Sequence, residues 1–185
     1  VEDLGGVAGE VEEVDEKPIS RKPAAPFITS TLQQEANRKL GLGAREAMQI
    51  AQGLYEQGFI TYMRTDSTFL SEQAIKATRG FIKKEYGADY LPNEPRTYEG
   101  KKVKGAQEAH EAIRPAGADF IKPEDTGLKA VQLKLYELIW KRTIASQMVN
   151  AAQKQVAVKF EVGNTVFQAN GLTLEFPGFL KVYRE

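Results

Sequence analysis

Residues 155–162 of the chain read Gln-Val-Ala-Val-Lys-Phe-Glu-Val and place a large apolar side chain at every second position. That period of two predicts a β-strand with one apolar face, formed by Val156, Val158, Phe160 and Val162. Gly163 and Asn164 then form a plausible hairpin turn into a strand at 165–169, and residues 172–176 predict a further strand. The C-terminal part of the chain is therefore expected to form a β-sheet.

Upstream of these strands, apolar residues recur at helical spacing. Ser30 and Gln33 form a capping-box pair that predicts the start of a helix, and Gly41 predicts its end. Three more helices are predicted at residues 44–57, 71–87 and 128–148. Residues 88–117 lack a clear period and contain several prolines and glycines, so a long loop is expected there. Long loops inside compact domains are commonly functional.

The two ends of the chain differ from its middle. Residues 1–26 mix acids, glycines and prolines, and they are expected to form a lead-in with one short strand near residues 17–20. A helical block thus stands between two β-forming ends. The simplest topology is an α+β fold in which a mainly helical domain, residues 27–148, is inserted into a β-rich domain built from residues 1–26 and 149–185.

Charge is distributed unevenly, although the chain is formally neutral. Residues 1–16 hold seven acids and no base, so the remaining residues carry 25 basic against 18 acidic side chains. A moderately basic body suits a polyanionic partner such as nucleic acid, but an ordinary solvated surface has the same composition. Charge alone therefore leaves both interpretations open.

The composition excludes several kinds of site. The chain has no cysteine, which removes disulfides, thiolate zinc sites and cysteine nucleophiles. No apolar run approaches the roughly 20 residues that cross a bilayer, so no membrane partner is expected. His110 is the only histidine and does not begin a His-Glu-x-x-His pattern, and no Asp-x-Asp pair occurs. No metal site is therefore expected in this chain.

The stretch with the most specific chemistry is residues 60–67, Ile-Thr-Tyr-Met-Arg-Thr-Asp-Ser. It is too short for a helix, so a brief extended segment is predicted, in which Tyr62 and Arg64 point to the same side. A free phenol is only about 0.1% ionised at neutral pH, so its attack on phosphorus needs help, which a guanidinium that grips the phosphodiester can supply. The same spacing also occurs in ordinary strands, where the ring packs at a core edge and the arginine is solvated.

His110 lies in the loop-rich region, within the stretch Ala-His-Glu-Ala-Ile-Arg-Pro of residues 109–115. A single histidine is usually structural or simply exposed. The polar, proline-terminated surroundings make a core position less expected here, and an imidazole suits a phosphate contact or a proton relay. The spacing by itself assigns no role.

Three stretches together resemble successive motifs of bacterial DNA topoisomerase I, a type IA topoisomerase. They are residues 60–67, residues 109–115 and the stretch Pro-Phe-Ile-Thr-Ser-Thr-Leu-Gln-Gln-Glu-Ala of residues 26–36. Their order along the chain makes this match far more specific than any one of them. The resemblance covers at least residues 23–148. The methionine at position 63 resembles the topoisomerase I group, since the related topoisomerase III group usually has proline at that position.

The resemblance implies roles for five side chains. Tyr62 matches the family nucleophile, which attacks one DNA strand and stays attached to its 5′ phosphate. Arg64 matches the arginine that contacts the cleavage site, and His110 matches a histidine linked to DNA binding and the cleavage centre. Asp66 and Arg114 lie in the same motifs and are expected to support the site or contact DNA. The implied partner is a single-stranded segment of DNA.

By the same resemblance, residues 27–148 are the movable gate domain and the β-forming ends belong to the arch that carries it. The family's Toprim domain, whose acidic site binds Mg²⁺, has no counterpart in this sequence. The chain is therefore expected to be part of a longer cytoplasmic, nucleoid-associated enzyme that relaxes negative supercoils, with the remaining domains as its partners. Alone it is expected to be inactive, because the scissile phosphate must be held against the tyrosine.

Two alternatives come from other functional classes. Tyrosine recombinases also use a tyrosine nucleophile, but theirs comes late in the chain, whereas Tyr62 precedes His110, and the separation of His110 from Arg114 does not fit their motif. A non-catalytic DNA-binding or interaction module with the same architecture stays open. Such a module would tolerate Tyr62→Phe in its parent protein.

Overall fold

The computed structural model describes residues 8–98 and 110–184, which divide into two compact units. One unit is a β-sheet from residues 8–22 and 150–178, and the other is a helical unit from residues 23–149, within the described ranges, and 179–184. Together these ranges contain four α-helices and one three-stranded antiparallel sheet. The mixed helix and sheet composition predicted from the sequence is thereby confirmed. Among these helices, none is long and apolar enough to span a membrane.

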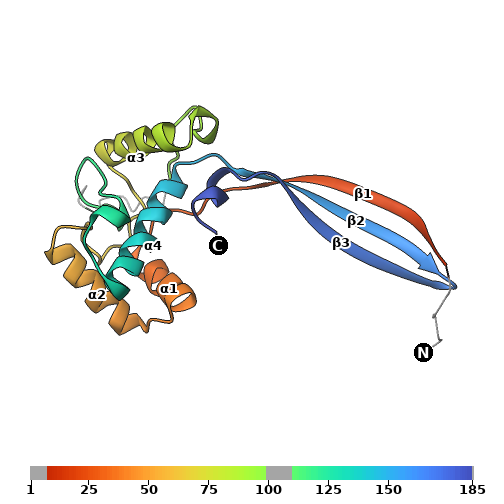
Figure 1. The fold of residues 1–185 in the computed structure, drawn as a ribbon, viewed down its shortest axis with the longest axis horizontal. Helices are drawn as coiled ribbons and strands as arrows, with labels where there is room; N and C mark the ends of the chain where they lie inside the picture. Colours follow the sequence, from red (N-terminus) through yellow and green to blue (C-terminus); the bar gives the residue numbers. More distant parts are fainter. Residues whose placement is uncertain (1–7, 99–109, 185) are drawn as a thin grey trace, which may run out of the picture. The chain divides into compact units, whose positions relative to one another are not determined.

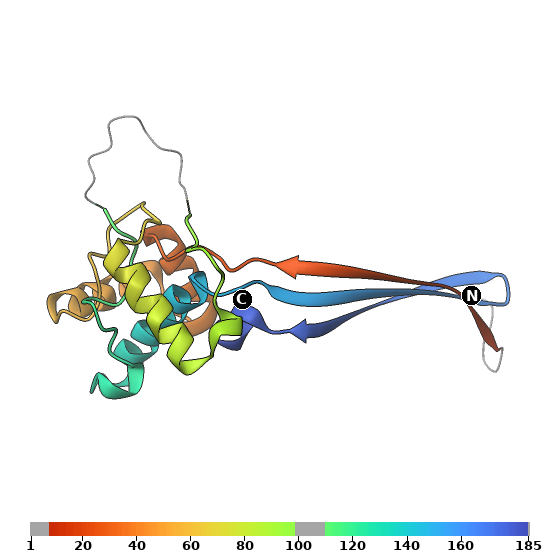
Figure 2. The same cartoon turned by 90° about the horizontal axis from the view of Figure 1, so that it is seen from above.

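The sheet unit has three long strands. They are β1 (Gly9–Arg21), β2 (Ala151–Val162) and β3 (Thr165–Phe176), hydrogen-bonded in the order β1-β2-β3 (Figures 1 and 2). β2 and β3 form a hairpin, and Gly163 at its turn has a φ of +63°, a conformation that favours glycine. The turn predicted at residues 163–164 is confirmed.

One face of the sheet carries the large apolar side chains of β2. Val158 of β2 lies opposite Val14 of β1 and Ala169 of β3. Phe160 lies opposite Phe167, and the two rings stack with their centroids 5.5 Å apart. Residues directly opposite in antiparallel strands point to the same face of the sheet. The alternation in residues 155–162 therefore places Val158 and Phe160 on one face, as the sequence predicts.

Strand lengths differ from the predictions. The single short strand expected near residues 17–20 is wrong, because β1 runs for 13 residues, and the two strands expected at 165–169 and 172–176 form one strand of 12 residues. Two acids of β1 are paired across the sheet: Lys159 Nζ lies 2.7 Å from a Glu13 carboxylate oxygen, and Lys154 Nζ lies 2.5 Å from one of Glu16. These cross-strand ion pairs allow an acidic segment to join the sheet.

The helical unit contains α1 (Thr29–Leu40), α2 (Ala44–Glu56), α3 (Glu72–Glu85) and α4 (Ala130–Ser146) (Figure 1). The four predicted helices are thus confirmed to within a few residues, while the predicted loop at 88–117 lies partly outside the described residues. α4 contacts each of the other three helices. Its buried side chains therefore lie around much of its circumference: Leu135, Tyr136, Leu138, Ile139, Trp140 and Ile144.

The starts of α1 and α3 are capped differently. At α3, which begins where the sequence predicts, the Ser71 hydroxyl accepts the Ala74 N–H. At α1 the predicted capping box of Ser30 and Gln33 is wrong. The helix begins at Thr29, and the Thr31 hydroxyl accepts the N–H of Ile28 at 3.0 Å. Ser30 and Gln33 instead line a pocket that is described below.

Residues 179–184 pack with the helical unit. Phe179 is fully buried, and its N–H donates to the Val149 carbonyl. The Tyr183 hydroxyl donates to Glu35 of α1, and hydrogen bonds from Arg38 and from Tyr183 overcome the opposing effect of burial and lower the pKa of Glu35 to about 2. The sequence assigned all of residues 149–185 to the β-rich part, and these last residues differ because their aromatic rings complete the helical core.

Candidate active site

Tyr62 lies after α2 in a stretch where the predicted extended segment is reduced to a single β-bridge of Ile60 with Pro115, followed by bends at Thr61 and Met63. The backbone before Tyr62 is bonded to residues 112–115. The Thr61 N–H donates to the Arg114 carbonyl at 2.9 Å. The Thr61 hydroxyl donates to the Ala112 carbonyl at 2.8 Å and accepts the Arg114 N–H at 3.0 Å. These three hydrogen bonds, which we call the Thr61 clip, fix the segment on one side of Tyr62.

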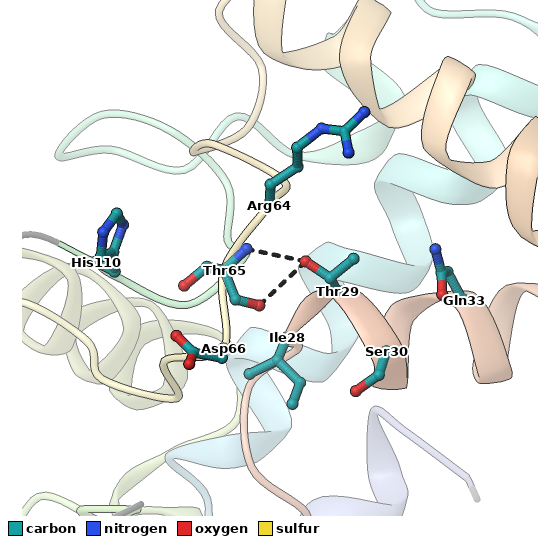
Figure 3. Close-up of a pocket in the computed structure, with 8 residues that line it drawn as sticks. All are labelled: Ile28, Thr29, Ser30, Gln33, Arg64, Thr65, Asp66 and His110. Carbon is teal, nitrogen blue, oxygen red and sulfur yellow. Dashed lines mark hydrogen bonds between the residues drawn. The ribbon is translucent and has the colours of Figure 1, made fainter. Parts of the chain in front are cut away.

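The backbone after Tyr62 is held by the first residue of α1. The Thr29 hydroxyl donates to the Met63 carbonyl at 2.8 Å and accepts the Thr65 N–H at 2.9 Å. The Thr29 N–H also donates to the Thr65 carbonyl at 2.9 Å (Figure 3 draws the contacts of the Thr29 hydroxyl with Thr65). We call this set the Thr29 clip. Since the Met63 side chain is only 1% exposed, it anchors the same stretch in the core.

The Tyr62 side chain projects from this clamped backbone. It is 45% exposed, and its ring lies edge-to-face against Tyr55 with the centroids 5.3 Å apart. Together with Thr61, Thr65, His110 and Glu111 it lines a pocket of about 160 Å³, the Tyr62 pocket. An exposed phenol on a fixed backbone can reach a phosphate that is presented from outside.

Arg64, Asp66 and His110 line a second, larger pocket of about 460 Å³ beside α1, the Arg64 pocket (Figure 3). All three side chains are exposed. In Figure 3, Arg64 projects toward the side on which Gln33 lies, while His110 and Asp66 lie on the other side of Thr65. The structure therefore gathers these predicted residues around one stretch of backbone, at the start of α1.

The two pockets adjoin. Thr65 and His110 line both of them, whereas Tyr62 and Arg64 line one each. Tyr62 and Arg64 are both exposed on either side of the buried Met63, but the described residues show no hydrogen bond between them. His110 is thus the predicted site residue that faces both the nucleophile candidate and the Arg64 pocket.

Arg114 is placed differently from the other four predicted residues. Its side chain is buried, with Nη2 2.6 Å from one carboxylate oxygen of Glu111. Its Nη1 donates to the carbonyl oxygens of Pro115 and Gly117. Burial raises the pKa of Glu111, but hydrogen bonds from Arg114 and Ser71 outweigh it, and the pKa ends below its ordinary value. Arg114 therefore holds residues 111–117 together, and Glu111, which accepts the Ser71 N–H at 2.7 Å, ties this loop to the start of α3.

Replacing Arg114 with methionine is expected to lower the free energy of unfolding of the helical unit by about 3 kcal/mol, because Glu111 would keep its charge in a half-buried position without its partner. Trp140 in α4 is the only tryptophan, so its fluorescence during urea unfolding reports on this unit. Arg64→Met removes an exposed guanidinium and is the control, with an expected change within about 0.5 kcal/mol. Equal free energies of unfolding for the two variants would contradict a structural role for Arg114.

Sequence reasoning missed the residues that hold the site. Thr29 and Thr61 carry no catalytic signature, and their roles depend on contacts with residues more than 30 positions away. The sequence pattern places Gln33 in a helix cap and gives Glu111 no role. The available signal was the density of hydroxyl and amide side chains in residues 26–36 and 60–67, which exceeds what a helix start and a short strand need.

Comparison with known proteins identifies a family. A family model described as DNA topoisomerase matches residues 1–185. The chain is 57% identical over 176 residues to DNA topoisomerase 1 of Synechococcus elongatus and 58% identical over 180 residues to that of Streptomyces coelicolor, in each case over 95% of this chain. It spans about a fifth of the length of these relatives, 20% and 19%.

A solved structure shows the same fold. The full-length topoisomerase I from Thermotoga maritima matches 99% of this chain and 31% of its own length, with a TM-score of 0.83 and 37% sequence identity. Sequence and structure thus agree on one family, and the chain belongs to the bacterial DNA topoisomerase I family.

Proposed function

We propose that this chain is the strand-cleaving part of a type IA DNA topoisomerase, and that Tyr62 is its nucleophile. The observation that carries the proposal is the exposed Tyr62 phenol on a backbone clamped from both sides by the Thr61 and Thr29 clips. His110 and Arg64 line the adjoining pockets, where a phosphodiester would meet a cation and an imidazole. Membership of the topoisomerase family supports the same assignment.

The proposed reaction exchanges one phosphodiester for another. The Tyr62 hydroxyl oxygen attacks phosphorus in one DNA strand, and the bond from phosphorus to the 3′ oxygen of the preceding sugar breaks. The phenolic proton leaves to a base or solvent, and the leaving 3′ oxygen takes up a proton from an acid or solvent. The product is a 5′-phosphotyrosine and a free 3′ hydroxyl. The reverse attack rejoins the strand, so no nucleotide triphosphate is consumed. Passage of the other strand through the gap relaxes negative supercoils.

The other site residues take positions around that phosphate. The Arg64 guanidinium can bind two phosphate oxygens and balance the charge that builds on them in the transition state. His110 faces both pockets and is proposed to contact the phosphate or to relay a proton. Asp66, exposed in the Arg64 pocket, supports the site at its rim. Arg114 acts as a positioning residue, because its guanidinium is bonded within the chain.

A Mg²⁺ site is implied for the whole enzyme by the family, but the described residues of this chain do not fit it. Among them, no group of three histidine or acidic side chains is arranged to hold a metal ion. We therefore propose that Mg²⁺ is bound by an acidic Toprim domain outside this chain. Without that domain the chain is expected to leave DNA uncut. The parent enzyme would act in the cytoplasm on nucleoid DNA, with this chain as its gate and part of its arch.

A non-catalytic DNA-binding module is the alternative. Exposed basic and amide side chains around the pockets would serve such a module equally well. The clamped, exposed Tyr62 favours catalysis, because a binding module needs no fixed phenol.

The test uses single-stranded DNA labelled at its 5′ or its 3′ end. The chain is mixed with a separately made Toprim-containing fragment and Mg²⁺, and the intact parent enzyme is run beside it. Transfer of the 3′ label to protein, with release of the 5′-labelled piece, is the expected result, since the tyrosine should hold the 5′ phosphate. Transfer of the 5′ label would reverse the polarity and favour the recombinase chemistry. If the intact parent forms no adduct either, the proposed function fails.

A further inference from the structure

The depression that contains Tyr62 continues onto α2. The Arg64 pocket, which adjoins the Tyr62 pocket through Thr65 and His110, also shares Arg64 and Gln33 with a third pocket of about 470 Å³, the α2 pocket. All three belong to the helical unit, and because each pocket shares lining residues with the next, they line up as a groove from Tyr62 past Arg64 to α2. The two larger pockets have volumes in the range of roughly 300–1,000 Å³ that is typical of ligand sites.

The α2 pocket is lined by cationic and amide side chains. Arg45, Gln49 and Gln52 are spaced by four and three residues and therefore share one face of α2. The opposite face is buried in the core through Ala47, Ala51 and Leu54. Among its described lining residues the α2 pocket has no carboxylate, whereas the Tyr62 pocket includes Glu111 and the Arg64 pocket includes Asp66. The groove thus becomes more positive away from the nucleophile.

Most of these polar side chains are available to a ligand. Gln52 donates to Glu56 at 2.7 Å, but within the described part of the chain Arg45, Gln49 and Gln33 form no side-chain hydrogen bond or ion pair. A guanidinium binds phosphate through two parallel hydrogen bonds, and a glutamine amide both donates and accepts, as the edge of a DNA base requires. Met48 adds an apolar surface for a sugar or base.

Exposed arginine and glutamine on a helix are usually solvated, but here they line a groove that leads directly to the nucleophile. We propose that the α2 pocket is a subsite for the DNA strand that Tyr62 cleaves. It would hold a nucleotide beyond the one whose phosphate is attacked, with Arg45 on a phosphate and Gln49 on a base edge. Arg64 would stand between the two phosphates. This inference rests on the proposed function, because it assigns the position of the same strand.

The test measures binding of a short fluorescein-labelled single-stranded oligonucleotide to the chain by fluorescence anisotropy, at several salt concentrations. The groove variant is Arg45→Ala with Gln49→Ala. The control is Lys83→Ala with Gln73→Ala, because these exposed α3 residues line none of the three pockets and lose the same charge and amide. The groove variant is expected to bind about tenfold more weakly, with a salt slope lower by about 0.7, the contribution of one phosphate contact on single-stranded DNA. The control should stay within about twofold.

Equal losses of affinity in the two double variants would indicate diffuse charge attraction and would overturn the subsite. No loss of affinity in either variant, or no binding by the unaltered chain, would overturn it as well. Tyr62→Phe should retain the affinity, because the phenol is not part of the α2 pocket. The same variants are then placed in the parent enzyme. If the groove variant binds and cleaves like the unaltered protein while Tyr62→Phe does not cleave, the subsite fails and the proposed function stands. If no variant or parent forms an adduct, the proposed function fails instead.

Discussion

Replacing Tyr62 with phenylalanine in the parent enzyme is expected to lower the rate of strand cleavage by at least about 10⁴-fold, the scale on which other covalent enzymes lose activity without their nucleophile. The change removes one exposed oxygen that bonds to none of the described residues and leaves the ring against Tyr55. The fold and the affinity for single-stranded DNA should therefore persist. Single-turnover cleavage of an end-labelled oligonucleotide measures the loss.

Tyr55→Phe is the matched control. Tyr55 is 41% exposed, and its ring is the neighbour of Tyr62, but it lies on α2 and lines none of the three groove pockets. This variant should cleave within about threefold of the unaltered enzyme, because only the edge of one ring contact changes. The reverse pattern, with cleavage lost in Tyr55→Phe and kept in Tyr62→Phe, would transfer the nucleophilic role to Tyr55.

Replacing Thr29 with valine is expected to slow cleavage by about 100-fold without weakening DNA binding. Valine keeps the shape of threonine but removes the hydroxyl that bonds to the Met63 carbonyl and the Thr65 N–H. The backbone after Tyr62 would then drift, and misplacement of a reacting group by about 1 Å can cost that factor. The measurement is the rate of adduct formation at saturating oligonucleotide, alongside the dissociation constant from anisotropy.

Two further variants separate positioning from stability. Thr31→Val removes a hydroxyl in the same turn of α1; this hydroxyl bonds to the Ile28 backbone and to no residue of the Tyr62 segment. The variant should therefore lower the free energy of unfolding by about 1 kcal/mol and leave the cleavage rate nearly unchanged. Thr29→Ser restores the hydroxyl and should recover most of the rate. Equal cleavage by Thr29→Val and Thr31→Val, or no recovery with serine, would show that the Thr29 clip does not position the nucleophile.

The regular elements were largely predictable from the sequence because local signals specify them. The caps and stops around α2 and α3 depend on nearby residues, so Ser71 could be assigned to a helix start. The alternation in β2 likewise follows from a period of two. β1 was not predictable in its full length, because the ion pairs that accommodate its acids reach lysines of β2 more than 130 positions away.

The sequence motifs select residues that the structure brings together, but they do not reveal the residues that hold them in place. Tyr62 and His110 come from separate motifs, and the structure places both residues in one pocket. The clips at Thr29 and Thr61 join segments that the chain order keeps apart, so no local pattern could reveal them. Arg114 lies in a motif with His110, but only the fold shows that its guanidinium is buried against Glu111.

The most direct test of Tyr62 as the nucleophile is identification of the residue that carries DNA. The parent enzyme would be trapped with a short oligonucleotide and digested with nuclease and trypsin. Trypsin should release residues 46–64 as one peptide, which contains both Tyr55 and Tyr62. Fragmentation in the mass spectrometer should then place the nucleotide on Tyr62. A nucleotide on Tyr55, or a modified peptide from elsewhere in the protein, would contradict the assignment.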